Sequence, residues 1–352
     1  MDFAFGERPL EFRTQLRALT DKICTPADIR ESWNSETGWS SSRWKALAEM
    51  GVVGLTVPES HGGLGFGLLD LVLLLEEAGR AGLPEPLLET TALGVPVLKA
   101  AADPGAEERR GQWLSKVAEG VAVIAIGTAD MPAVPAAGAA DLLLLERNGE
   151  LHAVPAEATV RRPRTSLDGG RRLAEISWEP TSETRLAAGE EATALLAALR
   201  HRGAMGTGAL LLGVADRLIT MTAAYAVDRV QFGSPIGSFQ AVKHHLANAL
   251  IRLEFARPAV YRAAWSLDND DPDAGCHASM AKALASDAAT GAARVALQLH
   301  GAIGYTWEHD IHLWMKRAWS LAAAWGDAGF HRARVLEILL AAEQGTEPSG
   351  GA

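Results

Sequence analysis

The sequence predicts an α+β protein that is mainly α-helical. Apolar residues recur at helical spacing through the first third of the 352-residue chain and again through its last half. Between these parts, from about residue 119, short apolar runs are bounded by Gly, Pro and Asn, as the strands of a small sheet would be. This order predicts an N-terminal helical domain (1–118), a small middle β domain (119–187), a C-terminal four-helix bundle (188–345) and a tail (346–352).

The helices of the first part are predicted from the spacing of their apolar residues and from the residues that end them. Two helical stripes are Phe12, Leu16 and Leu19, and then Trp44, Leu47, Met50 and Val53 ahead of the glycine-rich turn 58–65. A stronger helix is predicted over 68–80, because Gly82 and Pro84 follow it, and another over 89–101.

The middle part is predicted to contain four strands, at 121–126, 141–146, 149–154 and 173–178. Asn148 and Gly149 separate the second strand from the third, and this pair favours a two-residue hairpin turn.

The last part is predicted to contain long amphipathic helices joined by short loops. Their apolar stripes are Leu211, Val214, Leu218, Met221 and Tyr225; Val242, Leu246, Leu250, Leu253 and Val260; and Leu284, Ala288, Val295 and Leu299.

Composition excludes several classes of function. The 33 Lys and Arg against 43 Asp and Glu give a formal net charge of −10, which disfavours sequence-independent nucleic-acid binding. Cys24 and Cys276 cannot form a disulfide framework, and no basic segment followed by an apolar one opens the chain. The longest strongly apolar stretch, 68–75, is too short to span a bilayer and contains Asp70. We therefore expect a cytoplasmic protein with no membrane span and no nucleic-acid partner.

Common catalytic and metal-binding motifs are incomplete. The glycine-rich runs 62–67 and 206–208 follow no strand at the spacing of a dinucleotide-binding loop. His309 and His312 could share a helical face, but no third ligand accompanies them, so we expect no metal site. No G-x-S-x-G elbow occurs, which disfavours ordinary hydrolase chemistry.

The most informative residues lie in a loop between two predicted helices. The loop begins at Arg229, continues through Gln231, Phe232 and Gly233, and ends where Phe239-Gln240-Ala241-Val242 opens the next helix. This R-x-x-F-G and F-Q-A-V pattern resembles the flavin-contacting signature of the acyl-CoA dehydrogenase family.

Two further segments carry the same resemblance. Gln298-Leu299-His300-Gly301-Ala302-Ile303-Gly304-Tyr305 is similar to the family's Q-x-x-G-G-x-G-[FY] turn. Val57-Pro58-Glu59, Gly62-Gly63 and Glu76-Glu77-Ala78-Gly79-Arg80 are similar to its N-terminal helical domain. The three matches occur in order and span nearly the whole chain.

The resemblance implies the acyl-CoA dehydrogenase fold and a flavin cofactor, FAD. The residues implied to bind FAD are Arg229, Gln231, Phe232, Phe239, Gln240, Gln298, Gly301 and Ala302. An arginine fork suits a pyrophosphate, and a turn containing glycine lets backbone N–H groups approach it. In the family these groups reach across a subunit interface, so one chain completes the flavin site of its neighbour. The residues alone leave open that Arg229 pairs with a carboxylate and that Gly301 only caps a helix.

One departure from the family concerns the catalytic base. Family members abstract the α proton of the substrate with a glutamate in a Y-E-G-T turn, and here the matching segment places Trp325 at the base position. An indole has no basic lone pair. The alternative family position, in the helix before the arginine loop, falls near Gly203 and also lacks a carboxylate. Asp327 is a weak alternative, because it is shorter than glutamate and two residues away.

A second departure lies in the middle domain, which is short. The family's T-E-P-G-x-G-S-D-like flavin cradle corresponds to 126–132 here, which keeps little of it. The combination resembles the smaller subunit of actinobacterial heterotetrameric (α2β2) acyl-CoA dehydrogenases that act on CoA esters of steroid side chains. The resemblance therefore implies a catalytic partner subunit, an acyl-CoA substrate and an electron-transfer flavoprotein as acceptor.

Two alternatives stay open at this point. The chain could be a self-sufficient homo-oligomeric acyl-CoA dehydrogenase with an unrecognised base such as Asp327. It could also be a structural scaffold of the same fold that binds a partner and no flavin.

Overall fold

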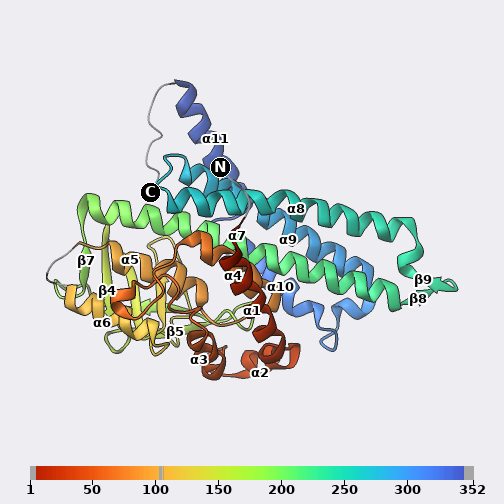
Figure 1. The fold of residues 1–352 in the computed structure, drawn as a ribbon, viewed down its shortest axis with the longest axis horizontal. Helices are drawn as coiled ribbons and strands as arrows, with labels where there is room; N and C mark the ends of the chain where they lie inside the picture. Colours follow the sequence, from red (N-terminus) through yellow and green to blue (C-terminus); the bar gives the residue numbers. More distant parts are fainter. Residues whose placement is uncertain (1–4, 103–104, 106, 345–352) are drawn as a thin grey trace. The chain divides into compact units, whose positions relative to one another are not determined.

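The computed structural model describes residues 5–102, 105 and 107–344, so the predicted tail (346–352) lies outside the described residues (Figure 1). The described chain forms two compact units. A mixed unit comprises Glu7–Leu75 and Leu83–Gly203, and a helical unit comprises residues 5–6, Glu76–Gly82 and 204–344. The fold is mainly helical with small sheets, as the sequence predicts.

The N-terminal part of the mixed unit is helical. Its helices are α1 (Glu7–Ile23), α2 (Pro26–Asn34), α3 (Ser41–Glu49), most of α4 (Leu68–Ala81), α5 (Val95–Ala100) and α6 (Glu107–Ala118). Thr25 and Asp28 form a capping box at the start of α2, where Pro26 is also favourable. The helix predicted over 68–80 is α4, whereas 89–101 divides into a π-helix (Leu88–Gly94) and α5.

Two small sheets complete the mixed unit. One has the strand order β1-β3-β4-β7, made of β1 (Ile124–Gly127), β3 (Leu142–Arg147), β4 (Glu150–Pro155) and β7 (Arg185–Ala187). The other has the order β2-β6-β5, made of β2 (Val134–Pro135), β6 (Leu173–Ser177) and β5 (Val160–Arg164). The predicted hairpin is present between β3 and β4, and both Asn148 and Gly149 have positive φ.

The strand β5 was not expected from the sequence. It lies at the edge of its sheet, most of its residues are exposed, and it contains Pro163. An edge strand with no buried face shows no alternation of polar and apolar residues, so periodicity does not identify it.

The helical unit contains the bundle. Its elements are the later part of α7 (Gly189–Asp228), the hairpin β8 (Val230–Gln231) and β9 (Ser234–Pro235), α8 (Gln240–Asp268), α9 (Ala274–His300), α10 (Ile311–Ala323) and α11 (Ala328–Gln344). Helices α4 and α7 pack backbone against backbone: a side chain at Gly79 would collide with the carbonyl of Leu210, and one at Gly213 with that of Glu76.

The predicted stripes of the bundle are only partly buried. Leu211, Val214 and Leu218 of α7 are fully buried, but Leu250 of α8 is 44% exposed and Leu284 of α9 is 40% exposed. The buried residues of α9 are largely alanines, at positions 278, 281, 283, 285, 288, 289, 292, 293 and 296. Small side chains let helices approach closely, so a search for large apolar residues misidentified this face.

Among the described residues, one helix, α7, is long and apolar enough to cross a membrane by length and composition alone. Half of its most apolar window is buried inside the fold. A core helix of a bundle has the same composition, so this observation is weak evidence for a membrane span.

Candidate cofactor-binding site

The arginine loop forms a tight hairpin at the end of α7. Strands β8 and β9 pair antiparallel, and the two residues between them, Phe232 and Gly233, both have positive φ. Such a turn matches the twist of a two-stranded ribbon. The backbone N–H of Ile236 donates to the carbonyl of Arg229 at 2.8 Å, which closes the hairpin before α8 begins.

The side chains of this loop are directed to solvent. Phe232 is 93% exposed, and Arg229, Gln231, Phe239 and Gln240 are exposed as well. The rings of Phe232 and Phe239 meet edge to face with centroids 6.2 Å apart. An exposed aromatic pair beside an exposed arginine forms a surface on which another molecule can bind.

The second predicted segment is the turn at the end of α9. The residue Gly301 has φ 64° and ψ −140°, a backbone conformation available essentially to glycine. No atom lies within 4 Å of the place where a Cβ would be. Gln298, Gly301 and Ala302 are all exposed, so the turn offers backbone and amide groups to solvent.

The two segments lie at the same end of the helical unit. The ring of Tyr225, in the last turn of α7, stacks on His300 at the end of α9 with centroids 4.2 Å apart. The His309 ring packs edge-on against both, at 5.9 Å from Tyr225 and 4.5 Å from His300. The eight predicted FAD-binding residues therefore lie in two segments, 229–240 and 298–302, that adjoin one aromatic cluster.

These residues fit the pyrophosphate of a dinucleotide. Within the described part of the chain, Arg229 has no carboxylate partner, which disfavours the alternative that it serves an internal ion pair. A free planar guanidinium and an open glycine turn are the groups that an anionic phosphate would need. The site-residue assignment itself remains a prediction.

Trp325, at the position that corresponds to the family's catalytic glutamate, lies in the turn between α10 and α11. Trp325 is half-buried, has φ 56°, and is followed by Gly326 with φ 90°. The carbonyl of Trp325 accepts a 2.8 Å hydrogen bond from Nε2–H of His331, which is 4% exposed. Burial lowers the pKa of His331 to about 4, so the imidazole is neutral at pH 7.

A buried lysine holds the same turn from the other side. Lys282 of α9 is fully buried, and its Nζ donates to the carbonyls of Ala322 and Gly326, both at 2.9 Å, and to Ser286 Oγ at 3.1 Å. Three acceptors satisfy the three donors of an ammonium group. The turn is therefore clamped by α9 and α11 together.

The carboxylate of Asp327 has a structural partner. It accepts a hydrogen bond from the backbone N–H of Phe330 at 2.8 Å, and bonds from Phe330 and Gly329 hold its pKa below the usual range. A general base works best with a pKa near the working pH, so a helix-capping carboxylate of low pKa is poorly suited to proton abstraction.

The counterpart of the flavin cradle lies at the end of β1 in the mixed unit. Thr128 is 6% exposed, and its hydroxyl has no hydrogen-bond partner among the described residues. Asp130 is exposed and lies 3.8 Å from Arg200, which also pairs with Glu146 at 3.3 Å.

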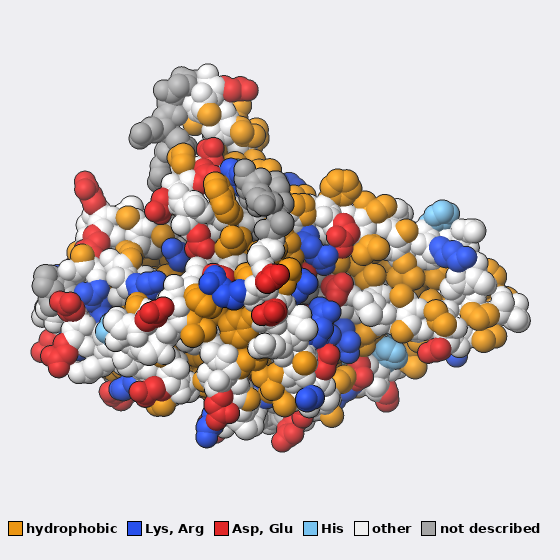
Figure 2. Space-filling model, viewed as in Figure 1, with side chains coloured by type: hydrophobic (Ala, Val, Ile, Leu, Met, Phe, Trp, Pro, Cys, Tyr) orange, Lys and Arg blue, Asp and Glu red, His pale blue; other side chains and the backbone are white. Residues whose placement is uncertain are grey.

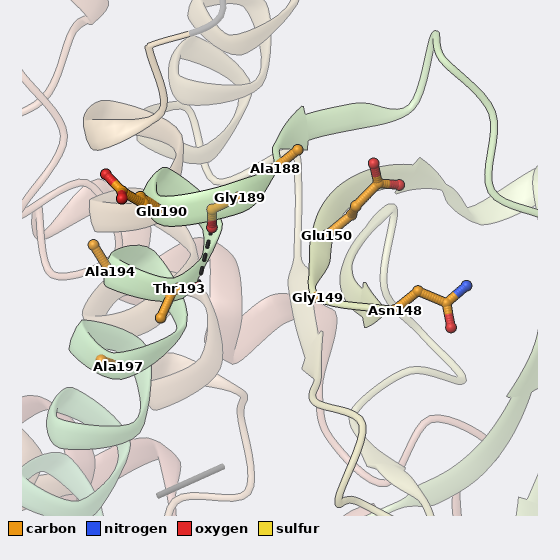
Figure 3. A pocket seen from close by; sticks show the side chains of 9 residues that line it. All are labelled: Asn148, Gly149, Glu150, Ala188, Gly189, Glu190, Thr193, Ala194 and Ala197. Carbon is orange, nitrogen blue, oxygen red and sulfur yellow. Dashed lines mark hydrogen bonds between the residues drawn. The ribbon is translucent and has the colours of Figure 1, made fainter. Parts of the chain in front are cut away.

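The mixed unit also has an open hollow of about 830 Å³ between the β3–β4 turn and the start of α7 (Figure 3). It is lined by Asn148, Gly149, Glu150, Ala188, Gly189, Glu190, Thr193, Ala194 and Ala197. The side chains of Asn148 and Glu150 extend away from α7. None of the predicted FAD-binding residues lines this hollow.

The two histidines weighed as metal ligands make other contacts. His309 belongs to the aromatic cluster with Tyr225 and His300, and His312 packs against Trp307 at 4.7 Å. Across the described part of the chain, no three His, Cys, Asp or Glu side chains gather as a metal site would require.

Sequence reasoning missed the residues that support the site. Lys282 stands among the alanines of α9, and this pattern could have indicated a buried lysine. Tyr225 was assigned only to an apolar stripe, and no local signal connects it with His300, which is 75 positions away.

Comparison with known proteins identifies the family of this chain. Residues 7–121 match the family model "Acyl-CoA dehydrogenase, N-terminal domain" and residues 193–340 match "Acyl-CoA dehydrogenase, C-terminal domain". Acyl-CoA dehydrogenase IpdE2 of Mycobacterium tuberculosis is 36% identical over 317 residues, which cover 88% of this chain and 92% of that protein. The chain belongs to the acyl-CoA dehydrogenase family. Membership implies an oxidoreductase with FAD as its cofactor.

Solved structures show the same fold. The steroid acyl-CoA dehydrogenase Tcur3481-Tcur3483 has a chain that is 24% identical with a TM-score of 0.84, and the match covers 96% of this chain and 99% of that chain. The ChsE4-ChsE5 complex of Mycobacterium tuberculosis has a chain with the same identity and TM-score, and that match covers 97% and 99%.

Proposed function

We propose that this chain is a subunit of a FAD-dependent acyl-CoA dehydrogenase and that it completes the FAD site of a catalytic partner subunit. The observation that carries the proposal is that the exposed Arg229 and the open Gly301 turn follow helix ends that the Tyr225–His300 stack holds together. Groups exposed on the surface of one chain can contact a cofactor that a neighbouring subunit holds.

The turn at the base position supports a non-catalytic role. Trp325 can donate one hydrogen bond and cannot accept a proton. Lys282 and His331 bind backbone carbonyls of this turn and fix its conformation. A small movement of the turn therefore cannot bring Asp327 to the place that Trp325 occupies. The glutamate that removes the α proton is then supplied by the partner.

Each group of this chain has a defined part in the proposed site. The guanidinium of Arg229 pairs with the pyrophosphate, Gln231, Gln240 and Gln298 donate hydrogen bonds, and the turn at Gly301 and Ala302 offers backbone N–H groups. Phe232 and Phe239 would shield the cofactor from water. The bound FAD would supply the hydride-accepting chemistry for dehydrogenation of the acyl thioester.

The substrate class in this proposal is an acyl-CoA thioester, with CoA esters of steroid side chains as the specific class. The resemblance to Tcur3481-Tcur3483, described as a steroid acyl-CoA dehydrogenase, supports it. The two-protein ChsE4-ChsE5 complex supports a heteromeric partner. We also propose an electron-transfer flavoprotein as acceptor, a cytoplasmic location, and the division into 1–118, 119–187 and 188–345.

Flavin stoichiometry tests the proposal. The tagged chain is purified once after expression alone and once from the organism that encodes it, and the flavin per chain is read from absorbance. The chain alone should hold little flavin, and the co-purified complex should hold FAD and oxidise an acyl-CoA. A flavin-loaded, active homo-oligomer would contradict the proposal and favour the self-sufficient alternative.

Substitution of Arg229 distinguishes the proposed function from the alternative that the chain is a structural scaffold that binds no flavin. Arg229→Ala should weaken FAD retention by the complex, because it removes a charged pair with the pyrophosphate. Arg162→Ala is the matched control, since Arg162 is an exposed arginine on β5. Equal flavin retention by both variants would show that Arg229 does not take part in binding FAD.

A further inference from the structure

The two-residue turn between β3 and β4 lies at the surface of the mixed unit. Asn148 has φ 55° and Gly149 has φ 74°, and both residues are exposed. No atom lies within 4 Å of the place where a Cβ of Gly149 would be, and the backbone N–H of Gly149 makes no hydrogen bond to any residue that the structure describes. The side chain of Asn148 extends away from α7 (Figure 3). The amide of Asn148 and the next backbone nitrogen along the chain are therefore both accessible to solvent.

We propose that Asn148 is a deamidation site, where the asparagine converts to aspartate and isoaspartate without an enzyme. In the first step the Gly149 nitrogen bonds to Cγ of Asn148 and the Cγ–Nδ2 bond breaks. The proton of the attacking nitrogen leaves with the amide as ammonia, and a succinimide ring remains. In the second step a water molecule from the solvent adds to one of the two ring carbonyls. Cleavage of the N–Cγ bond gives aspartate, whereas cleavage at the main-chain carbonyl gives isoaspartate, in which the chain continues through Cγ.

The glycine after Asn148 favours ring closure. Any other residue carries a Cβ that crowds the attacking nitrogen, and glycine does not. Closure also requires rotation within the turn, and the space around Gly149 is open, so the turn can deform without displacing a packed side chain. The exposed tip of a hairpin is a place where the backbone opens at low cost.

Three other asparagines in the sequence provide internal comparisons, and none of them precedes a glycine. Asn34 is the last residue of α2. The nitrogen that would attack it belongs to Ser35, and its N–H donates to the carbonyls of Glu31 and Ser32, both at 3.1 Å. That nitrogen is therefore held in the end of the helix.

The remaining two asparagines are held by helix α8. Asn248 lies inside the helix, and the next residue, Ala249, is 4% exposed, with its N–H in the helical hydrogen-bond pattern. The side-chain amide of Asn269 donates to the carbonyl of Trp265 at 2.8 Å. Both positions therefore resist the rotation that ring closure requires.

The two products differ in how well they fit the turn. Aspartate tolerates a positive φ as asparagine does, so it preserves the hairpin. Isoaspartate adds a methylene group to the backbone. Arg147 pairs with Glu150 across a turn of two residues, and a longer turn does not preserve this pairing. Isoaspartate therefore disrupts the end of the β3–β4 hairpin.

Either product adds a carboxylate to a part of the surface that already carries several. Asn148 lines the hollow at the start of α7 together with Glu150 and Glu190. Acidic side chains also lie where Figure 1 places β4 and β7 (Figure 2). Because like charges repel, deamidation makes the hollow less favourable for an anionic ligand. The turn contains none of the predicted FAD-binding residues, so this inference does not depend on the proposed function.

Peptide mapping by mass spectrometry tests the site. The purified chain is incubated at pH 8.5 and at pH 5, and the conversion of each asparagine to the acid is followed with time. An unincubated sample digested in parallel corrects for conversion during digestion. Asn148 should convert at least about tenfold faster than each other asparagine, which corresponds to about 1.4 kcal/mol of activation free energy. It should convert faster at pH 8.5, because the attacking nitrogen must lose its proton. Conversion of Asn148 no faster than that of Asn34, Asn248 or Asn269 would overturn the proposal.

A pair of variants provides a second measurement. The incubated wild-type chain should develop an acidic species on isoelectric focusing. Asn148→Gln should lose most of this species, because glutamine would have to form a larger ring. Asn248→Gln is the matched control, since Asn248 is also exposed, and it should keep the species. Equal amounts of the acidic species in both variants would place the modification elsewhere and overturn the proposal.

The effect on the hairpin is tested with Asn148→Asp, which carries the aspartate product from the start. Its urea denaturation midpoint should equal that of the wild type. The isoaspartate form, separated by chromatography from the incubated wild-type chain, should unfold at a lower urea concentration. Equal midpoints for the isoaspartate form and Asn148→Asp would contradict the disruption of the hairpin.

Discussion

The ring of Tyr225 stacks on His300 with centroids 4.2 Å apart and an angle of 23° between the planes. Tyr225 lies four residues before Arg229, and His300 lies between Gln298 and Gly301. The stack therefore joins the ends of α7 and α9 at the point where each passes into a loop with predicted FAD-binding residues. A change in this contact should affect both loops together.

The first prediction concerns this stack. Tyr225→Ala should lower the free energy of unfolding by at least about 1 kcal/mol, because an aromatic pair contributes about 0.5–1.5 kcal/mol beyond the burial of its area. It should also weaken FAD retention by the complex. Tyr225→Phe keeps the ring and should resemble the wild type in both measurements. If Tyr225→Ala leaves flavin retention unchanged, the two loops do not depend on their shared support.

The second prediction concerns the turn at the end of α9. Gly301→Ala should destabilise the protein by about 1–3 kcal/mol, because φ 64° with ψ −140° is strained for any residue with a Cβ. The space around the position is open, so the cost comes from the backbone and not from a collision. Gly138→Ala is the control, since Gly138 is equally open and has no positive φ. Equal urea denaturation midpoints for the two variants would contradict this explanation.

Local patterns in the sequence were sufficient for the features that depend on neighbouring residues. Asn148 and Gly149 form the predicted hairpin turn, because a two-residue turn with two positive φ angles strongly selects this pair. The helix over 68–80 was predicted for a similar reason, since Gly82 and Pro84 end it. The segments at Arg229 and Gly301 were identified by their resemblance to family motifs, and these motifs also consist of neighbouring residues.

Features that depend on distant parts of the chain could not be predicted in this way. Leu250 belongs to a predicted apolar stripe because it is apolar and correctly spaced, yet it is 44% exposed. Periodicity shows that a helix has an apolar face, but not whether the same chain covers it. The buried charge of Lys282 was missed for a related reason, because its three acceptors include carbonyls 40 and 44 residues away.

The third prediction concerns the lysine clamp. Lys282→Met should lower the free energy of unfolding by at least about 2 kcal/mol, because it removes the Lys282 hydrogen bonds to the part-buried carbonyls of Ala322 and Gly326, and an unsatisfied group of this kind costs about 1–3 kcal/mol. Lys45→Met is the control: Lys45 is an exposed lysine whose pair with Glu49, at 3.8 Å, contributes little. Chemical denaturation of both variants measures the difference, and equal stability would show that the clamp is not needed.

The fourth prediction concerns the pH dependence that His331 gives to stability. Burial lowers its pKa to about 4, whereas the unfolded chain titrates near 6.5, so the unfolded state binds more protons between these values. The contribution is therefore complete above about pH 6.5 and is lost as the pH falls toward 4. A shift of this size amounts to about 3 kcal/mol at most.

The measurement that isolates this contribution compares two histidine variants. The free energy of unfolding of the wild-type chain should rise between pH 4 and pH 6.5, and His331→Gln should rise less steeply, because it removes one group that takes up a proton on unfolding. His245→Gln, at an exposed position on α8, should keep the wild-type slope. Burial also lowers the pKa of His152 and of His300. These two residues add equally to the pH dependence of the unfolding free energy in the wild type and in both variants. Identical slopes for His331→Gln and the wild type would mean that His331 is not held neutral in the folded protein.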